Sequence, residues 1–161
     1  MKLIRSDKKQ FTFSLHKREK QLLFHILQMY PLVPVSHQRL SRGEKGGAEH
    51  EDQHVLEEAL TESRRENRAR VLALLRERFH QTAKEFEFSI AVSEIQWLLQ
   101  VLNDLRVGAW LALGQPEELE VPETNEANAP YLLAMDAAGM FQCELLSILG
   151  YTQPPLRPDE T

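Results

Sequence analysis

The sequence predicts an α+β domain that is predominantly helical, with about four main helices around a central buried helix and a small antiparallel sheet. Three observations lead to this fold class. Two short segments, residues 11–15 and 86–90, alternate between apolar and polar side chains, as half-buried strands do. Most other apolar residues recur at helical spacing, and residues 93–113 are apolar on most of a helix circumference. The length of 161 residues suits one domain with its own core.

The expected strands need partners, because a short strand alone leaves its backbone hydrogen bonds unmade. Residues 3–5 can pair with residues 11–15 across a short polar turn. Residues 86–90 carry the same alternation as residues 11–15. We therefore expect these two segments to lie side by side, with the phenylalanines of both facing one core.

Two helices are expected in the first half of the chain. The first begins near Lys17 and ends at Pro31, since proline cannot continue a helix. The second runs from about Glu51 to Lys84, and its apolar residues fit one stripe except over residues 61–70, which are almost wholly polar. Either this helix projects into solvent at that point or it breaks into two.

Two further helices are expected in the second half. The central helix, residues 93–113, begins at a capping box formed by Ser93 and Gln96. The last helix spans about residues 132–149, and Pro130 suits its first position. A glycine follows each of these helices, as is common after a helix end.

Three segments are expected to lack regular structure. Residues 41–50 form a glycine-containing loop that we expect to be mobile, and residues 115–129 form an acidic linker with five glutamates and no basic residue. The tail, residues 151–161, has three prolines, and we expect it to be disordered. Residues 1–150 then form a single globular domain.

Charge is divided unevenly along the chain. Residues 1–45 carry ten Lys or Arg against three Asp or Glu, a balance of +7, and the remainder carries nine against twenty-one, a balance of −12. The opposed halves either attract each other, within the fold or between subunits, or form two separately solvated surfaces. The overall charge of −5 argues against a nucleic-acid partner.

The cysteine count and the hydropathy of the chain indicate in which cellular compartment we expect the protein. The single cysteine, Cys143, cannot form an internal disulfide, and we expect it to be a small core residue. No stretch approaches the roughly 18 apolar residues of a membrane span, and no signal-peptide core is present at the N-terminus. We expect a cytoplasmic protein with no membrane contact.

The chain resembles itself at an offset of 75 residues. Residues 11–23 and 86–98 share Phe, Phe, Ser, Glu, Gln and Leu at matching positions, and the change from strand to helix falls at the same place in both. One interpretation is a duplicated strand–helix unit whose strands pair about a pseudo-twofold axis. The other is that any strand leading into an amphipathic helix produces this pattern by chance.

The residues His50, Glu51 and His54 match the H-E-x-x-H pattern, in which two histidines one helical turn apart bind zinc and the glutamate activates water. The surroundings are polar and a third ligand is not evident in the sequence. Acidic residues at 51 and 52 also suit the first turn of a helix, where the dipole favours them. We expect no bound metal, and a zinc-dependent hydrolase using these three residues stays as an alternative.

An arginine-rich stretch is the second motif. Six arginines fall within fifteen residues: Arg64, Arg65, Arg68, Arg70, Arg76 and Arg78. They could form a basic face for nucleic acid, but glutamates are interleaved and no aromatic residue for base stacking lies among them. We interpret the stretch as a solvated helix face, with a nucleic-acid-binding regulator as the alternative.

A polar cluster interrupts the central helix at Asn103, Asp104 and Arg106. Helical geometry places Asn103, Arg106 and Trp110 on one flank and Asp104 on the other, so Asp104 and Arg106 cannot easily pair. Each needs a partner from elsewhere if it is buried. The cluster either bridges to neighbouring elements or, with Trp110, receives a partner molecule.

The segment Leu102-Asn103-Asp104-Leu105-Arg106, entered from Trp97 and followed by Gly114, resembles the core of an uncharacterised bacterial family, the actinobacterial domain of unknown function numbered twenty-seventeen. Trp110 departs from that family, which has glycine there. Genes of the family often neighbour that of the Clp protease adaptor, so the resemblance implies a link with regulated proteolysis. It implies no catalytic residues.

The expected function is a non-catalytic interaction or regulatory protein, and whether the chain is an enzyme stays open. We expect a protein partner or self-association and no cofactor. The candidate partner-binding residues are Asn103, Asp104, Arg106 and Trp110. The sequence does not indicate whether a small molecule binds.

Overall fold

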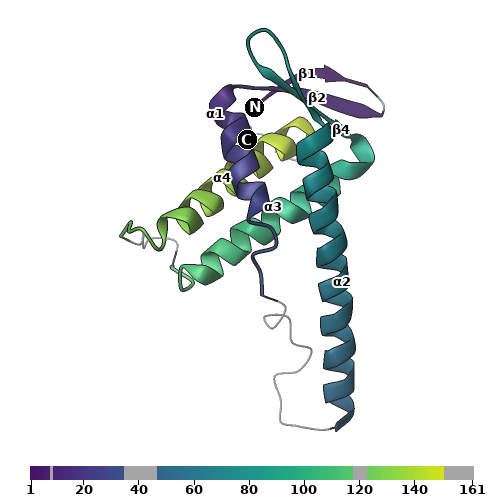
Figure 1. The fold of residues 1–161 in the computed structure, drawn as a ribbon, viewed down its shortest axis with the longest axis vertical. Helices are drawn as coiled ribbons and strands as arrows, with labels where there is room; N and C mark the ends of the chain where they lie inside the picture. Colours follow the sequence, from purple (N-terminus) through teal and green to yellow (C-terminus); the bar gives the residue numbers. More distant parts are fainter. Residues whose placement is uncertain (8, 35–46, 118–122, 151–161) are drawn as a thin grey trace, which may run out of the picture.

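The computed structural model describes residues 1–7, 9–34, 47–117 and 123–150, apart from the side chains of residues 47–52 (Figure 1). This part of the chain forms four helices and one four-stranded antiparallel sheet. Their order is β1 (Lys2–Ser6), β2 (Gln10–Leu15), α1 (Lys17–Gln28), α2 (Gly47–Glu77), β3 (Phe79–Gln81), β4 (Phe86–Ala91), α3 (Val92–Ala112) and α4 (Ala129–Ile148). The predicted fold class, α+β and predominantly helical, is confirmed.

The sheet has the strand order β1-β2-β4-β3, so the two predicted strands form its centre. Phe13 and Phe88 lie opposite each other in the register, both are buried, and their ring centroids are 6.1 Å apart. The predicted pairing of the two segments is therefore confirmed. Strand β3 was not predicted: Phe79 fitted the stripe of the preceding helix, but it lies opposite Phe88 with the rings stacked 4.8 Å apart.

The register of β2 with β4 has the symmetry that the internal sequence similarity suggested. Phe11 faces Ile90 and Leu15 faces Phe86, while Phe13 faces Phe88, its own counterpart 75 positions later. A twofold axis between the two phenylalanines therefore relates the strands. The two strand–helix units have equivalent structural roles.

The helix starts follow the same relation. The Glu19 carboxylate accepts from the backbone N–H of His16, and the Glu94 carboxylate accepts from that of Ala91 at 3.3 Å. These pairs are again 75 residues apart. The predicted capping box of Ser93 with Gln96 is wrong, because α3 begins one residue earlier and Glu94 provides the cap.

Helix α3 is central, as predicted. One of its faces packs along α4 and the other faces α1 and α2, and its N-terminal end follows β4 (Figure 1). The largest fully buried side chains come from the sheet, α1, α3 and α4: Phe13, Phe88, Phe141, Leu15, Ile26, Leu27, Ile90, Ile95, Leu98, Leu102, Leu105 and Leu145. None of the described helices has the length and apolar character needed to cross a membrane.

Helix α2 is one unbroken helix of 31 residues, which confirms that it projects and excludes a break (Figure 1). Its C-terminal part is buried through Val71, Leu74 and Leu75, and most of the side chains of residues 53–70 are exposed. Residues 47–50 are helical, so the predicted loop 41–50 is wrong over those four residues. Residues 41–46, part of the acidic linker (118–122) and the tail (151–161) lie outside the described residues.

Helix α4 corrects the placement of the cysteine. Cys143 is exposed, whereas Ala138, Phe141 and Leu145 form the buried face of the helix. The expected core cysteine is therefore wrong, because α4 is apolar around most of its circumference and the sequence does not show which face turns inward.

Candidate functional site

The chain crosses α3 directly after α1, and we call residues 30–33 the crossover segment. The Leu32 N–H donates to Asp104 Oδ1 at 2.8 Å, and the Val33 N–H lies 3.4 Å from the same oxygen. One turn further along α3 stands Gly108, where an added Cβ would lie 2.3 Å from Leu32 Cβ and 2.7 Å from the Val33 nitrogen. Asp104 and Gly108 together hold the crossover segment against α3.

These contacts identify the partners of Asp104 that the sequence required. Burial raises the pKa of its carboxyl group above the ordinary value, and the hydrogen bonds from Leu32 and Val33 and the charge of Arg64 offset part of that effect. Asp104 is half-buried and bonded to backbone, so the bridging role of this member of the polar cluster is confirmed.

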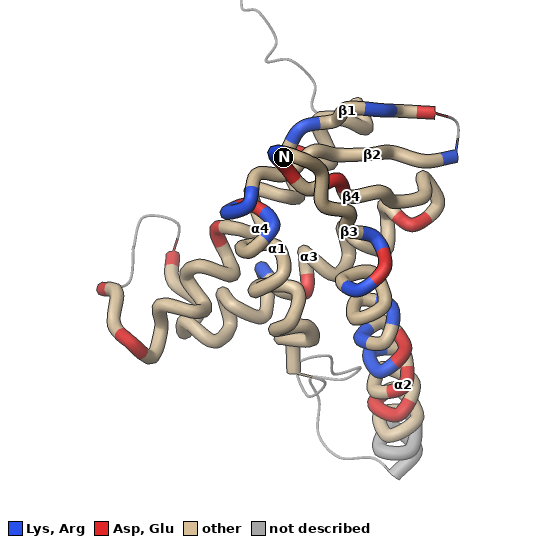
Figure 2. The backbone as a smooth tube through the Cα atoms, turned by 45° about the horizontal axis from the view of Figure 1, so that its top comes forward, with Lys and Arg blue, Asp and Glu red and all other residues tan. Residues whose placement is uncertain are grey.

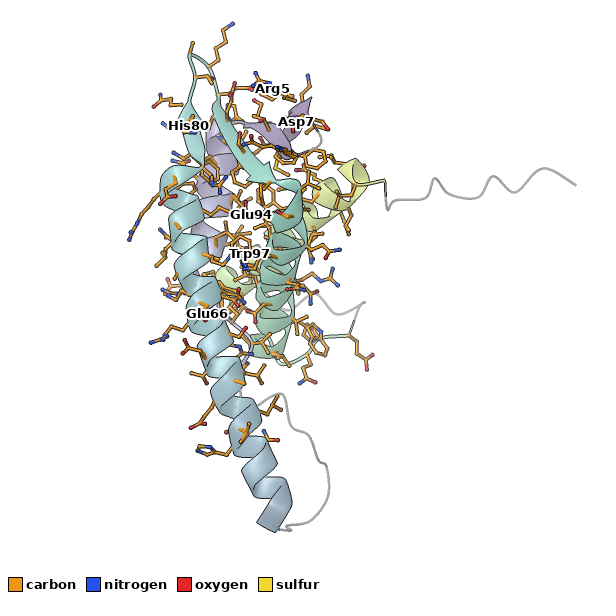
Figure 3. All side chains as sticks on the ribbon, turned by 90° about the vertical axis from the view of Figure 1, so that its right-hand side faces the viewer. Arg5, Asp7, Glu66, His80, Glu94 and Trp97 are labelled. Atoms are coloured by element: carbon orange, nitrogen blue, oxygen red, sulfur yellow. The ribbon has the colours of Figure 1, made fainter. Side chains whose placement is uncertain are left out.

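Polar side chains add to the apolar burial that attaches helix α2 to the rest of the molecule. Arg68 donates to the Tyr30 carbonyl oxygen, and the Trp97 indole N–H donates to Asn67 Oδ1 at 2.9 Å. The Arg70 guanidinium lies 4.2 Å from the centroid of the Trp97 ring, a cation–π distance. In Figure 3, Trp97 and Glu94 lie on α3 beside α2.

Most arginines of this stretch therefore contact other residues of the same chain. Besides Arg68 and Arg70, Arg78 pairs with Glu94 at 3.5 Å and Arg65 pairs with Glu62 at 2.7 Å. Basic and acidic residues are interleaved along α2 (Figure 2). This arrangement supports neither a continuous basic face nor a stacking platform for nucleic acid.

A pocket of ≈ 290 Å³ lies where α2 and α3 diverge, and we call it the α2–α3 pocket. Its lining residues are Tyr30, Val33, Asn67, Gln100, Val101, Asn103, Asp104 and Val107. Tyr30 is buried, and burial raises the pKa of its hydroxyl group, an effect that the neighbouring Asn67 side chain partly offsets. Gln100 and Asn103 are exposed, and within the described residues neither carboxamide has a hydrogen-bond partner.

The four predicted partner-binding residues fall in two places. Asn103 and Asp104 line the α2–α3 pocket. Arg106 lies instead beside α4, with its Cδ 3.8 Å from the position of a Cβ on Gly139, and the Trp110 indole N–H donates to the Pro116 carbonyl at 3.1 Å. The structure brings the first two together and separates them from the other two.

Sequence reasoning missed Tyr30, Asn67 and Gln100 as pocket residues. Gln100 could have been found, because it stands three residues before Asn103 and shares its side of the helix. Tyr30 and Asn67 come from other elements, and no local pattern links them to α3.

The proposed zinc ligands lie at the start of α2. His54 is 67% exposed, and its Nδ1 is 3.6 Å from Glu58 Oε1. The side chains of His50 and Glu51 lie outside the described residues. Across the residues that are described, no group of three or more His, Cys, Asp or Glu is placed to hold a metal ion.

Comparison with protein-family models, with curated proteins and with solved structures gave no match. The resemblance at residues 102–106 stays a prediction. Function must therefore be argued from the geometry of the chain itself.

Proposed function

We propose that this chain is a non-catalytic interaction protein that binds a segment of another polypeptide in the α2–α3 pocket. The observation that carries the proposal is the pair of exposed carboxamides, Gln100 and Asn103, which have no hydrogen-bond partner within the described residues beside a preformed pocket. Each carboxamide offers two donors and an acceptor, which complement the N–H and C=O of a peptide group. Asp104 and Asn67 stand on helices and are held by their own hydrogen bonds.

The size of the pocket supports a polypeptide rather than a large cofactor. A volume of ≈ 290 Å³ is at the lower end for small-molecule sites, which run from about 300 to 1,000 Å³. It can take one side chain of a bound segment, while the carboxamides at its edge bond the adjoining backbone. The family resemblance adds a class of partner to this proposal, a component of regulated proteolysis.

A photo-crosslinking residue at position 103 tests the proposal in native lysate. The control carries the same residue at Gln81, which is exposed on β3 at the sheet. We expect a polypeptide adduct at position 103 only, and its loss when Gln100→Ala is added, a surface change that should alter stability by less than about 0.5 kcal/mol. Equal capture at both positions, capture unaffected by Gln100→Ala, or an RNA adduct would contradict the proposal.

Zinc content distinguishes the hydrolase alternative. We expect the purified protein to hold no stoichiometric zinc by elemental analysis, because His54 is exposed and paired with Glu58. One zinc per chain that is lost in His54→Ala and kept in His80→Ala, a change at another exposed histidine, would favour the hydrolase.

A further inference from the structure

The outward face of α4 carries an exposed row of five residues, which we call the α4 stripe: Leu133, Asp136, Met140, Cys143 and Ser147. Leu133 is 44% exposed and Met140 is 40% exposed, although both are large apolar side chains. The spacings of three, four, three and four residues keep the row on one line of the helix. That line spans about 21 Å at 1.5 Å per residue, and the same spacing forms the contact line between paired helices.

The composition of the α4 stripe differs from that of the exposed faces of α1 and α2. Exposed residues on α1 and α2 are mostly charged or polar, for example Lys17, Arg18 and Glu66. Helix α4 contains no Lys or Arg, and Asp136 is the only charge in its stripe. Depletion of charge together with exposed methionine is typical of the centre of a protein–protein interface.

We propose that the α4 stripe pairs with the α4 stripe of a second copy of this chain, antiparallel about a twofold axis at Met140. Leu133 and Ser147 each lie seven residues from Met140, and Asp136 and Cys143 lie four and three residues from it, so this pairing places Met140 on Met140, Leu133 on Ser147 and Asp136 within one residue of Cys143. A parallel pairing would place Asp136 on Asp136, and two facing carboxylates repel each other.

Charge complementarity favours a second copy as the occupant. Arg106 lies beside Gly139 at the edge of the stripe, is exposed, and has no ion-pair partner among the described residues. The twofold rotation keeps this edge on the same side in both copies, so Arg106 of one copy lies on the same edge of the contact as Asp136 of the other. Each copy then contributes one opposite-charge pair at the rim of an apolar contact.

Sedimentation of the full chain between about 1 and 100 μM tests the pairing. We expect a concentration-dependent dimer whose Kd rises at least about 30-fold in Met140→Glu, the loss expected for a central apolar side chain. The matched control is Val55→Glu on α2, where the side chain is 64% exposed and away from the stripe; it should dimerise as the wild type does. A wild type that is monomeric throughout, or equal loss in Val55→Glu, would overturn the proposal.

Cys143 provides a second measurement that does not depend on a destabilising variant. Its reaction with a maleimide should slow as the wild-type concentration rises, because the thiol is covered in the dimer. Protection that is independent of concentration would mean that something else covers the stripe, and would overturn the pairing.

Cross-linking tests the direction of the pairing. Under oxidant, Asp136→Cys should form a covalent dimer linked from position 136 to Cys143 of the other copy, whereas the wild type should give no such dimer. A linkage from Cys143 to Cys143 in the wild type would show parallel helices and refute the proposed register.

Discussion

Two regions of the molecule are joined to α3 in different ways. The sheet strands β2 and β4 and the helix α4 pack through apolar side chains, with Phe88, Leu102 and Phe141 buried among them. The helix α2 and the crossover segment also bury apolar side chains, Val71, Leu74, Leu75 and Tyr30, but they add polar contacts to α3 through Asp104, the Asn67–Trp97 hydrogen bond and the arginine contacts. Apolar burial contributes through many small contacts, whereas a polar attachment depends on a few atoms. Matched substitutions can therefore distinguish the contributions of the two regions to stability.

The largest expected effect is in the apolar region. Phe13→Ala and Phe88→Ala should each lower the free energy of unfolding by about 3–5 kcal/mol, because both side chains are buried at the centre of the sheet. The loss in free energy of unfolding in the double variant should differ from the sum of the two single losses, because the two rings are neighbours at 6.1 Å and share one space. Denaturant unfolding measures all three. Losses near zero would show that these rings are not buried in solution.

The next effect concerns the close approach of the crossover segment. Gly108→Ala should destabilise the protein by about 3 kcal/mol, the upper end for overpacking, because the new Cβ meets Leu32 at 2.3 Å. Gly139→Ala is the matched control on a helix without such a contact: its nearest atom is Arg106 Cδ at 3.8 Å, so it should stabilise by up to about 1 kcal/mol. Effects of the same sign in thermal unfolding would contradict the docking of residues 32 and 33 on α3.

A third prediction separates charge from hydrogen bonding at Asp104. Asp104→Ala leaves the Leu32 and Val33 N–H groups without an acceptor and should cost about 1–3 kcal/mol. Asp104→Asn keeps an acceptor oxygen and removes a partly buried charge, so it should be neutral or stabilising at pH 7.

The pH dependence follows from the raised pKa of Asp104. The folded chain binds this proton more tightly than the unfolded chain does, so the contribution of Asp104 becomes more favourable as the pH falls from neutral through the raised pKa toward 3.8. Over that pH range, the free energy of unfolding of the wild type should therefore rise relative to that of Asp104→Asn. A difference between the two that does not change with pH would show that the carboxyl group is not buried.

The smallest expected effect is in the attachment of α2. Asn67→Ala removes the acceptor of the Trp97 indole and should cost about 1 kcal/mol. Amide exchange should rise in the C-terminal part of α2 more than in α4, because the loss is local. The control is Asn103→Ala, whose side chain has no hydrogen-bond partner within the described residues and should change stability by less than about 0.5 kcal/mol. A uniform rise in exchange across both helices would mean that the two regions unfold together.

The sequence by itself determined the main helices, the pairing of residues 11–15 with 86–90 and the central place of α3. Each of these follows from a local period of apolar residues, two for the strands and 3.6 for the helices. The period shows which face of the element is buried, and the buried faces must pack against one another. The offset of 75 residues allowed two interpretations, and the register of β2 with β4 agrees with the one in which the strands pair about a twofold axis.

Tertiary structure alone decided the short strand β3, the face of α4 that turns outward and the composition of the candidate site. Three residues are too few to show a period, and Phe79 fits a helix stripe as well as a strand. Cys143 lies on a helix that is apolar nearly all round, so only packing selects its exposed side. Asp104 finds its partners 72 and 71 residues away in the chain, and the α2–α3 pocket draws Tyr30, Asn67 and Asn103 from three segments. Contacts between segments that distant are set by how the helices pack, which no local pattern records.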